Sequence, residues 1–203
     1  MRAWAIPVGG TVLVAAAVAA RGAVAPPWLW LVYNLGLAWV PLLIGAAASR
    51  GRAGLLGLGL PWLLFLPNAP YLLTDLVHLR AYPGVPLWFD VALLGGAGAL
   101  GLAIGARSVA DMAAAVCQEI GPRAALAVTV FAPVASGFGM YLGRFERWNS
   151  WSVLTRPDQL LADGLGPLLH PAHHVEAWAF TSVFGGLFLV AALGAPVRRT
   201  IPG

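Results

Sequence analysis

The sequence predicts an all-α integral membrane protein, a polytopic transmembrane bundle of about six spans. Hydrophobic residues make up 60% of the 203 residues and charged residues 10%, whereas soluble domains carry about 25% charged residues. Several apolar runs reach or approach the roughly 20 residues that cross a bilayer as a helix. A soluble core of this size would need many more polar residues to cover it. The whole chain, residues 1–203, is therefore expected to form a single integral membrane domain.

The first two predicted spans cover residues 4–20 and 28–47. The first has an alanine-rich end followed by an arginine, so it also fits a cleaved signal peptide. The second span begins with Trp28, Trp30 and Tyr33. Because amphipathic rings favour the headgroup region, these three side chains are expected to anchor the second span at the membrane interface.

The third span starts near Leu55 and is predicted to be broken at Pro67–Pro70. Proline removes a helix hydrogen bond and disfavours helical geometry in the residue before it. Backbone groups freed in this way need other partners inside a membrane, and we expect Asn68 and Thr74 to supply them. The apolar first half is too short to cross alone, so the break is expected to lie in the membrane or its interface.

The remaining predicted spans cover residues 88–106, 124–142 and 176–193. A polar connection is expected over residues 107–123, and a polar loop is expected from the end of the fifth span to about residue 175. Small residues recur every four positions in two of these spans, which lets another helix approach closely. The small residues are Ala97, Gly101 and Gly105 in the fourth span, and Gly139 and Gly143 in the fifth.

Arginine placement favours a cytoplasmic location for both termini, because cytoplasmic loops carry an excess of positive charge. Every one of the 12 basic residues is arginine, and five of them fall on the other side in this orientation. Three of those five, Arg144, Arg147 and Arg156, follow the fifth span closely. Arginines placed against the usual rule suggest a local role, such as pairing with a carboxylate or holding an anion.

Polar residues resume directly after the proline break. On an α-helix, Thr74, Asp75 and His78 would share one face, because residues three and four apart are neighbours. Ionisable groups at membrane depth are costly and indicate a functional site. Asp75 and His78 are therefore candidates for metal ligands or for a catalytic acid/base pair. The alternative is an interfacial helix end whose polar residues meet water and headgroups.

The stretch after the fifth span combines guanidinium and indole groups. Arg144 and Arg147, with Trp148 and Trp151, fit either an aromatic belt with snorkelling arginines or an anion-binding mouth covered by indoles. A nucleophilic role for Ser150 would require a base within reach. The ends of the third and fifth spans are separated by an even number of crossings, so both polar stretches are expected to meet at one membrane face. The candidate ligand-binding residues are Asn68, Tyr71, Thr74, Asp75, His78, Arg144, Arg147, Trp148, Asn149, Ser150 and Trp151.

The same two stretches carry a specific resemblance to a known family. They read Leu66-Pro67-Asn68-Ala69-Pro70-Tyr71 with Thr74-Asp75-Leu76 and His78-Leu79, and Gly143-Arg144-Phe145 with Arg147-Trp148-Asn149-Ser150-Trp151. In these stretches the sequence resembles DUF1361, a family of uncharacterised bacterial membrane proteins. An aspartate usually follows the second tryptophan in that family, whereas this chain has Ser152, which weakens any mechanism that needs a carboxylate there. The resemblance implies a multi-pass protein of the bacterial inner membrane and supplies no activity.

Three functions remain open from the sequence. The first is a membrane-embedded binding or transport component for a small anionic or amphipathic ligand or a lipid headgroup. The second is a membrane enzyme acting on a lipid-linked or envelope substrate, and the third is a structural or assembly partner. The expected partner is the lipid bilayer, and no nucleic acid, cofactor or resident metal is expected. His170, His173, His174 and Glu176 are interpreted as a solvated entry to the last span rather than a metal site.

Overall fold

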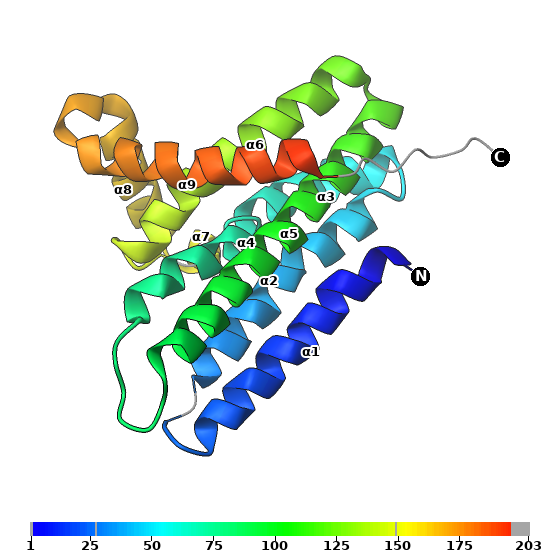
Figure 1. Cartoon of the computed structure of the whole chain (residues 1–203). Helices are drawn as coiled ribbons and strands as arrows, with labels where there is room; N and C mark the ends of the chain where they lie inside the picture. The colour runs from blue at the N-terminus through cyan, green and yellow to red at the C-terminus, as the bar shows by residue number, and fades with distance from the viewer. Residues whose placement is uncertain (1, 27, 149, 196–203) are drawn as a thin grey trace.

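The protein is an α-helical bundle in the computed structural model, which describes residues 2–26, 28–148 and 150–195 (Figure 1). Six helical segments of the described chain are long and apolar enough to cross a membrane. The predicted class is therefore confirmed. These segments are α1 (Arg2–Gly22), α2 (Leu29–Ala48), Arg52–His78, α5 (Leu87–Glu119), α6 (Pro122–Arg144) and α9 (Val175–Gly194).

The third segment consists of three helical pieces. These are α3 (Arg52–Phe65), α4 (Asn68–Tyr71) and the 3-10 helix η1 (Leu72–His78). Asn68 Nδ2 donates to the carbonyl oxygen of Phe65 at 2.9 Å, and Thr74 Oγ1 donates to that of Tyr71 at 2.7 Å. Both bonds satisfy backbone carbonyls next to the prolines, as expected from the sequence. The depth of this segment in a bilayer stays a prediction.

Helix α5 extends 13 residues beyond the predicted end of the fourth span, so the expected polar connection over residues 107–123 is wrong. Val109, Met112 and Val116 are buried at helical spacing and hold this part of α5 in the core. The polar residues that suggested a loop pair within the helix, since Arg107 Nε lies 2.7 Å from Asp111 Oδ2 one turn later.

The small-residue face predicted on α5 lies against the third and last membrane segments. A methyl group at Gly101 would collide with the carbonyl oxygen of Ala69, and one at Gly105 would lie 2.9 Å from the ring of Phe188 in α9. Helix α5 thus approaches the backbone of α4 more closely than any larger side chain allows. This part of the prediction is confirmed.

Helix α5 also joins the two apolar cores of the bundle. One core packs its first half against α1, α2, α4 and η1, and includes Leu35, Leu94 and Ile104. The other packs its second half against α3, α6 and α9, and includes Val109 and Phe188. Figure 1 shows α5 running through the middle of the bundle, with α9 crossing it.

The region expected as a polar loop before the last span contains three short helices. They are α7 (Ser152–Thr155), α8 (Pro157–Leu169) and η2 (Pro171–His173). Proline at the first position of α8 has the φ angle that a helix start requires, and Asp158 in the first turn complements the helix dipole. The expectation of a loop is therefore wrong for α8.

Candidate functional site

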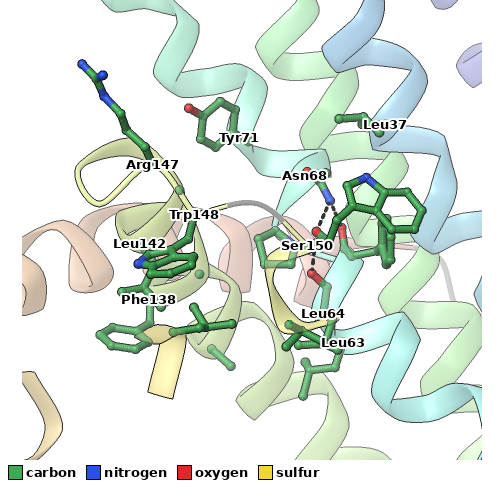
Figure 2. Close-up of a pocket in the computed structure, with 18 of the residues that line it drawn as sticks. Leu37, Leu63, Leu64, Asn68, Tyr71, Phe138, Leu142, Arg147, Trp148 and Ser150 are labelled. Atoms are coloured by element: carbon green, nitrogen blue, oxygen red, sulfur yellow. Dashed lines mark hydrogen bonds between the residues drawn. The ribbon is translucent and has the colours of Figure 1, made fainter. Parts of the chain in front are cut away.

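A cavity of about 520 Å³ lies between α2, the α3–α4 junction, α6 and the segment that follows α6 (Figure 2). Most of its wall is apolar, with Leu37, Leu63 and Phe138 among the lining residues. Of the eleven candidate ligand-binding residues, six line it: Asn68, Tyr71, Arg147, Trp148, Ser150 and Trp151. The two polar stretches identified from the sequence therefore meet at one cavity.

A hydrogen-bonded link joins the two stretches at the cavity wall. Asn68 Nδ2 donates to Ser150 Oγ at 3.0 Å, and Ser150 Oγ donates to the carbonyl oxygen of Leu64 at 3.1 Å. Figure 2 shows this chain of bonds beside the α3–α4 junction. The proline-containing turn thereby gains a partner that is more than 80 residues away in sequence. Asn149, between Trp148 and Ser150, lies outside the described residues.

Glycines on α6 make room for this junction. A methyl group at Gly139 would lie 2.6 Å from the ring of Pro67. One at Gly143 would lie 3.3 Å from the carbonyl oxygen of Trp148 and 3.4 Å from the ring of Tyr71. The predicted packing face of the fifth span is therefore turned toward the α3–α4 junction and the chain that follows α6.

Both tryptophans at the cavity are fixed by neighbours from other segments. Trp148 Nε1 donates to Asp163 Oδ2 of α8 at 2.9 Å, and the guanidinium of Arg156 lies 4.7 Å from the centre of the Trp148 ring system. Trp151 packs edge-on against Phe65, with ring centres 5.0 Å apart. These contacts fix the orientation of both indoles at the cavity. A location of the two rings in an aromatic belt at the membrane interface stays a prediction.

Arg147 lines the cavity from an unusual backbone conformation. Its φ of 57° lies in the left-handed region, where glycine is the usual residue after a helix end. The side chain is exposed, and it makes no hydrogen bond or ion pair with the described residues. Figure 2 shows its guanidinium pointing away from both Tyr71 and the Asn68–Ser150 bond. A non-glycine residue in this conformation costs of order 1–3 kcal/mol.

Asp75 lies behind the cavity wall. Its side chain is buried, with the residue 1% exposed, and Oδ2 accepts a hydrogen bond from Asn34 Nδ2 at 3.1 Å. Asn34 also lines the cavity, so it connects the wall to the buried carboxylate. Arg144 is half-buried at the end of α6 and interacts electrostatically with both Asp75 and His78.

Thr74, Asp75 and His78 do not share one helix face, in contrast to the arrangement predicted for an α-helix. Residues 72–78 form a 3-10 helix with three residues per turn, so Thr74 is turned away from the row that contains Asp75 and His78. His78 is exposed and packs on Trp30, with ring centres 4.7 Å apart, and forms no ion pair with Asp75. The expectation that all three share one face is therefore wrong.

Among the described residues, no group of three or more His, Cys, Asp and Glu side chains is placed to hold a metal ion. Near the start of the last span, His170 and His173 are exposed, with ring centres 6.3 Å apart. Glu176 is exposed as well. His174, the fourth residue of this group, is half-buried, so the solvated entry to α9 consists of the other three side chains.

Most of the chain matches the model of one protein family. A family model described as "Protein of unknown function (DUF1361)" matches residues 33–191, which is most of the chain. The chain belongs to the DUF1361 family. No curated protein and no solved structure gives a significant match. All eleven candidate residues lie within the matched range, which also covers most of the bundle from α2 to α9.

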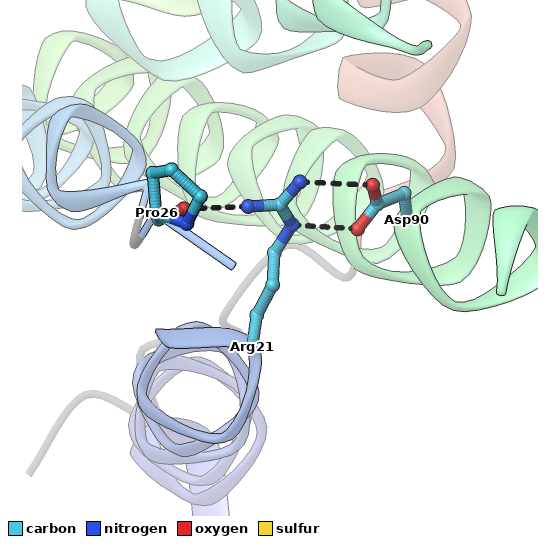
Figure 3. Close-up of polar contacts among 3 residues, drawn as sticks. All are labelled: Arg21, Pro26 and Asp90. Carbon is cyan, nitrogen blue, oxygen red and sulfur yellow. Dashed lines mark hydrogen bonds and ion pairs between the residues drawn. The ribbon is translucent and has the colours of Figure 1, made fainter. Parts of the chain in front are cut away.

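A second polar cluster of this DUF1361 protein was missed from the sequence. Arg21 at the end of α1 and Asp90 near the start of α5 form a buried ion pair, with side chains 2% and 1% exposed (Figure 3). Nε donates to Oδ1 at 2.8 Å and Nη2 to Oδ2 at 3.2 Å, which is a two-pronged contact. Nη1 donates to the carbonyl oxygen of Pro26 at 2.6 Å.

An aromatic cover completes this ion pair. The guanidinium of Arg21 lies 3.8 Å from the centre of the Trp28 ring system. Trp28 is buried, so its predicted role as an interface anchor is wrong and its ring shields the charge instead. The sequence held a signal for the pair, because the end of the first span and the start of the fourth lie on the same side of the membrane.

Proposed function

We propose that this DUF1361 protein binds a small amphipathic molecule at the non-cytoplasmic face of a bacterial inner membrane. The anionic group of the molecule would contact Arg147, and its apolar part would enter the cavity. The proposal rests mainly on one observation, the cationic and indole groups at the edge of a largely apolar cavity. Such a combination of apolar wall and few polar groups is typical of small-molecule sites.

The cavity has a suitable size and lining for an amphipathic ligand. Its volume of about 520 Å³ falls within the range of roughly 300–1,000 Å³ that small-molecule sites occupy. Leu37 and Leu63 offer an apolar surface, while the amide of Asn68 and the hydroxyl of Ser150 add polar atoms at the wall. A purely polar ion would make no use of the apolar wall, and a pure hydrocarbon would make no use of the charge of Arg147.

The charge of Arg147 favours an anionic group. A guanidinium presents several donors in a plane and pairs well with carboxylate or phosphate oxygens. Because Arg147 has no ion-pair partner among the described residues, an anion would meet an available cation. The strained backbone at Arg147 also suggests function, since strain of this kind gathers at binding and catalytic sites.

The contacts of Ser150 favour binding over nucleophilic catalysis. Its hydroxyl donates to the carbonyl oxygen of Leu64 and accepts from Asn68. Activation of a serine requires a base that takes this proton, and neither described partner is a base. The enzyme, transport and assembly hypotheses stay predictions, without an observation that favours one of them.

Filling the cavity tests the proposal directly. Ala135 lines the cavity from an exposed position on α6, so Ala135→Trp adds bulk there without entering the core. We expect the amount of anionic amphiphile that copurifies with the variant to be at least tenfold lower than with the wild type. Mass spectrometry of solvent extracts measures both amounts. Ala127→Trp is the matched control, because Ala127 is an exposed residue of α6 outside the cavity lining. Equal amounts of every bound species in all three proteins would contradict the proposal.

Two substitutions at Arg147 separate charge from backbone strain. Arg147→Gln and Arg147→Gly both remove the cation, so both should lose the anionic species. Glycine adopts a φ of 57° without the steric cost that other residues meet. Arg147→Gly should therefore be more stable than Arg147→Gln by about 1 kcal/mol in denaturant unfolding. Retention of the anionic species by both variants would remove Arg147 from the site.

A further inference from the structure

Helix α8 has an apolar face that is largely exposed. Leu161, Leu165 and Leu168 recur at helical spacing and are 62%, 45% and 52% exposed, and Leu169 beside them is 67% exposed. Residues spaced in this way form one stripe along a helix. Leu154 in the preceding α7 is 77% exposed and adds to the apolar surface of this region.

The opposite side of α8 is attached to the body of the protein. Asp163 is two residues from both Leu161 and Leu165, which places it roughly 200° around the helix from each. Its carboxylate accepts the Trp148 Nε1 hydrogen bond at 2.9 Å. The carbonyl oxygen of the buried Pro167 accepts a bond from Trp178 Nε1 of α9 at 3.0 Å. These two indole contacts fix the rotation of α8, so its leucines must face outward.

The length and connections of α8 place it at a membrane surface. Its 13 residues span about 20 Å, which is too short to cross a hydrocarbon layer of roughly 30 Å. The helix connects the end of α6 to the start of α9, and both of these are membrane-spanning candidates. Figure 1 shows α8 beside these two helix ends. Since α6 and α9 emerge on the same side, both ends of α8 are held at the same surface.

We propose that α8 is an interfacial helix that lies along the bilayer surface with its leucine face among the lipid acyl chains. An amphipathic helix of this kind buries its apolar side about 5–10 Å into the boundary between headgroups and chains. The occupant of the leucine face is the same bilayer that α6 and α9 cross. The inference does not depend on the proposed ligand. It does bring the cavity, which Leu160 of α8 helps to line, next to the lipid headgroups.

The depth of single labels tests this placement in the full-length protein. Cys117 is exposed, so Cys117→Ser gives a background in which Leu165→Cys or Leu161→Cys carries the probe. Gln159→Cys is the matched control, because Gln159 is exposed on the same helix, two residues from Leu161 and away from the stripe. Each variant is labelled with an NBD fluorophore and reconstituted in phosphatidylcholine/phosphatidylglycerol vesicles. Quenching is measured with lipid nitroxides at shallow and deep acyl positions and with aqueous iodide.

We expect the two leucine positions to be quenched at least twofold more by the shallow nitroxide than by the deep one, and to be shielded from iodide. The Gln159→Cys label should be quenched more strongly by aqueous iodide than by either lipid nitroxide. Equal iodide quenching of Leu165→Cys and Gln159→Cys would overturn the proposal by placing α8 in water. Strongest quenching by the deep nitroxide, or shielding from all three quenchers, would overturn it as well. The former would mean insertion, and the latter would mean coverage by protein.

Discussion

Replacing Arg21 with methionine should destabilise the protein by about 3–5 kcal/mol, the usual cost of leaving one partner of a buried ion pair uncompensated. Asp90 is 1% exposed and receives two of the hydrogen bonds of Arg21. Without them the carboxylate keeps no described side-chain partner in an apolar setting. Unfolding of the purified protein by sodium dodecyl sulfate in mixed micelles, followed by tryptophan fluorescence, measures the loss.

The double variant Arg21→Met/Asp90→Leu distinguishes the ion pair from simple packing. Apolar pairs of similar size often replace buried ion pairs without loss, so this variant should regain most of the lost stability. Arg107→Met is a matched control, because Arg107 pairs with Asp111 at a similar distance but with side chains 16% and 25% exposed. We expect it to cost less than about 1 kcal/mol. Equal losses for Arg21→Met and Arg107→Met would show that burial of the pair is unimportant.

Gly101→Ala should also cost about 1–3 kcal/mol, the usual price of overpacking. The added methyl group would collide with the carbonyl oxygen of Ala69 and lie 2.8 Å from a methyl carbon of Leu72. A backbone carbonyl cannot turn aside as a flexible side chain does, so α4 and α5 must separate. Because α4 carries Asn68, its bond to Ser150 should weaken too. The same detergent unfolding measurement reports the loss of stability.

Gly96→Ala provides the comparison on the same helix. Nothing lies within 4 Å of a methyl group built at Gly96, and alanine is the better helix former by up to about 1 kcal/mol. The control should therefore be neutral or stabilising. If Gly101→Ala were equally neutral, the close approach of α4 and α5 would not be needed for stability.

The number and approximate positions of the spans could be predicted from the sequence, because the length of an apolar run depends on local composition. The ends of the helices could be predicted less well. Residues 107–119 looked like a connection because Arg107 and Asp111 are polar, yet this pair is satisfied within the helix and the residues between them pack in the core. Helix α8 was missed for a related reason, since glycines, prolines and exposed leucines give no sustained apolar run.

The meeting of the two polar stretches followed from counting membrane crossings. Their detailed partners did not, because those depend on how each helix is rotated about its axis. Asn34 illustrates this limit, since one polar residue in an apolar span does not reveal that it will bind Asp75. For His78, the sequence left a pairing with Asp75 and an interfacial helix end both open, and it did not reveal that the ring would pack on Trp30 at the end of η1. The number of crossings places Arg21 and Asp90 on the same side of the membrane, but it does not show that the two side chains will meet.

The 33 residues of α5 have a consequence for how the protein sits in lipid. The helix measures about 50 Å end to end, against a hydrocarbon layer of roughly 30 Å. Even at about 40°, the upper end of observed helix tilts, it would still rise some 38 Å along the membrane normal. Part of α5 must therefore stand among headgroups or water, or the surrounding bilayer must thicken. Because α5 contributes residues to both apolar cores, one continuous helix connects the parts of the protein in the two leaflets.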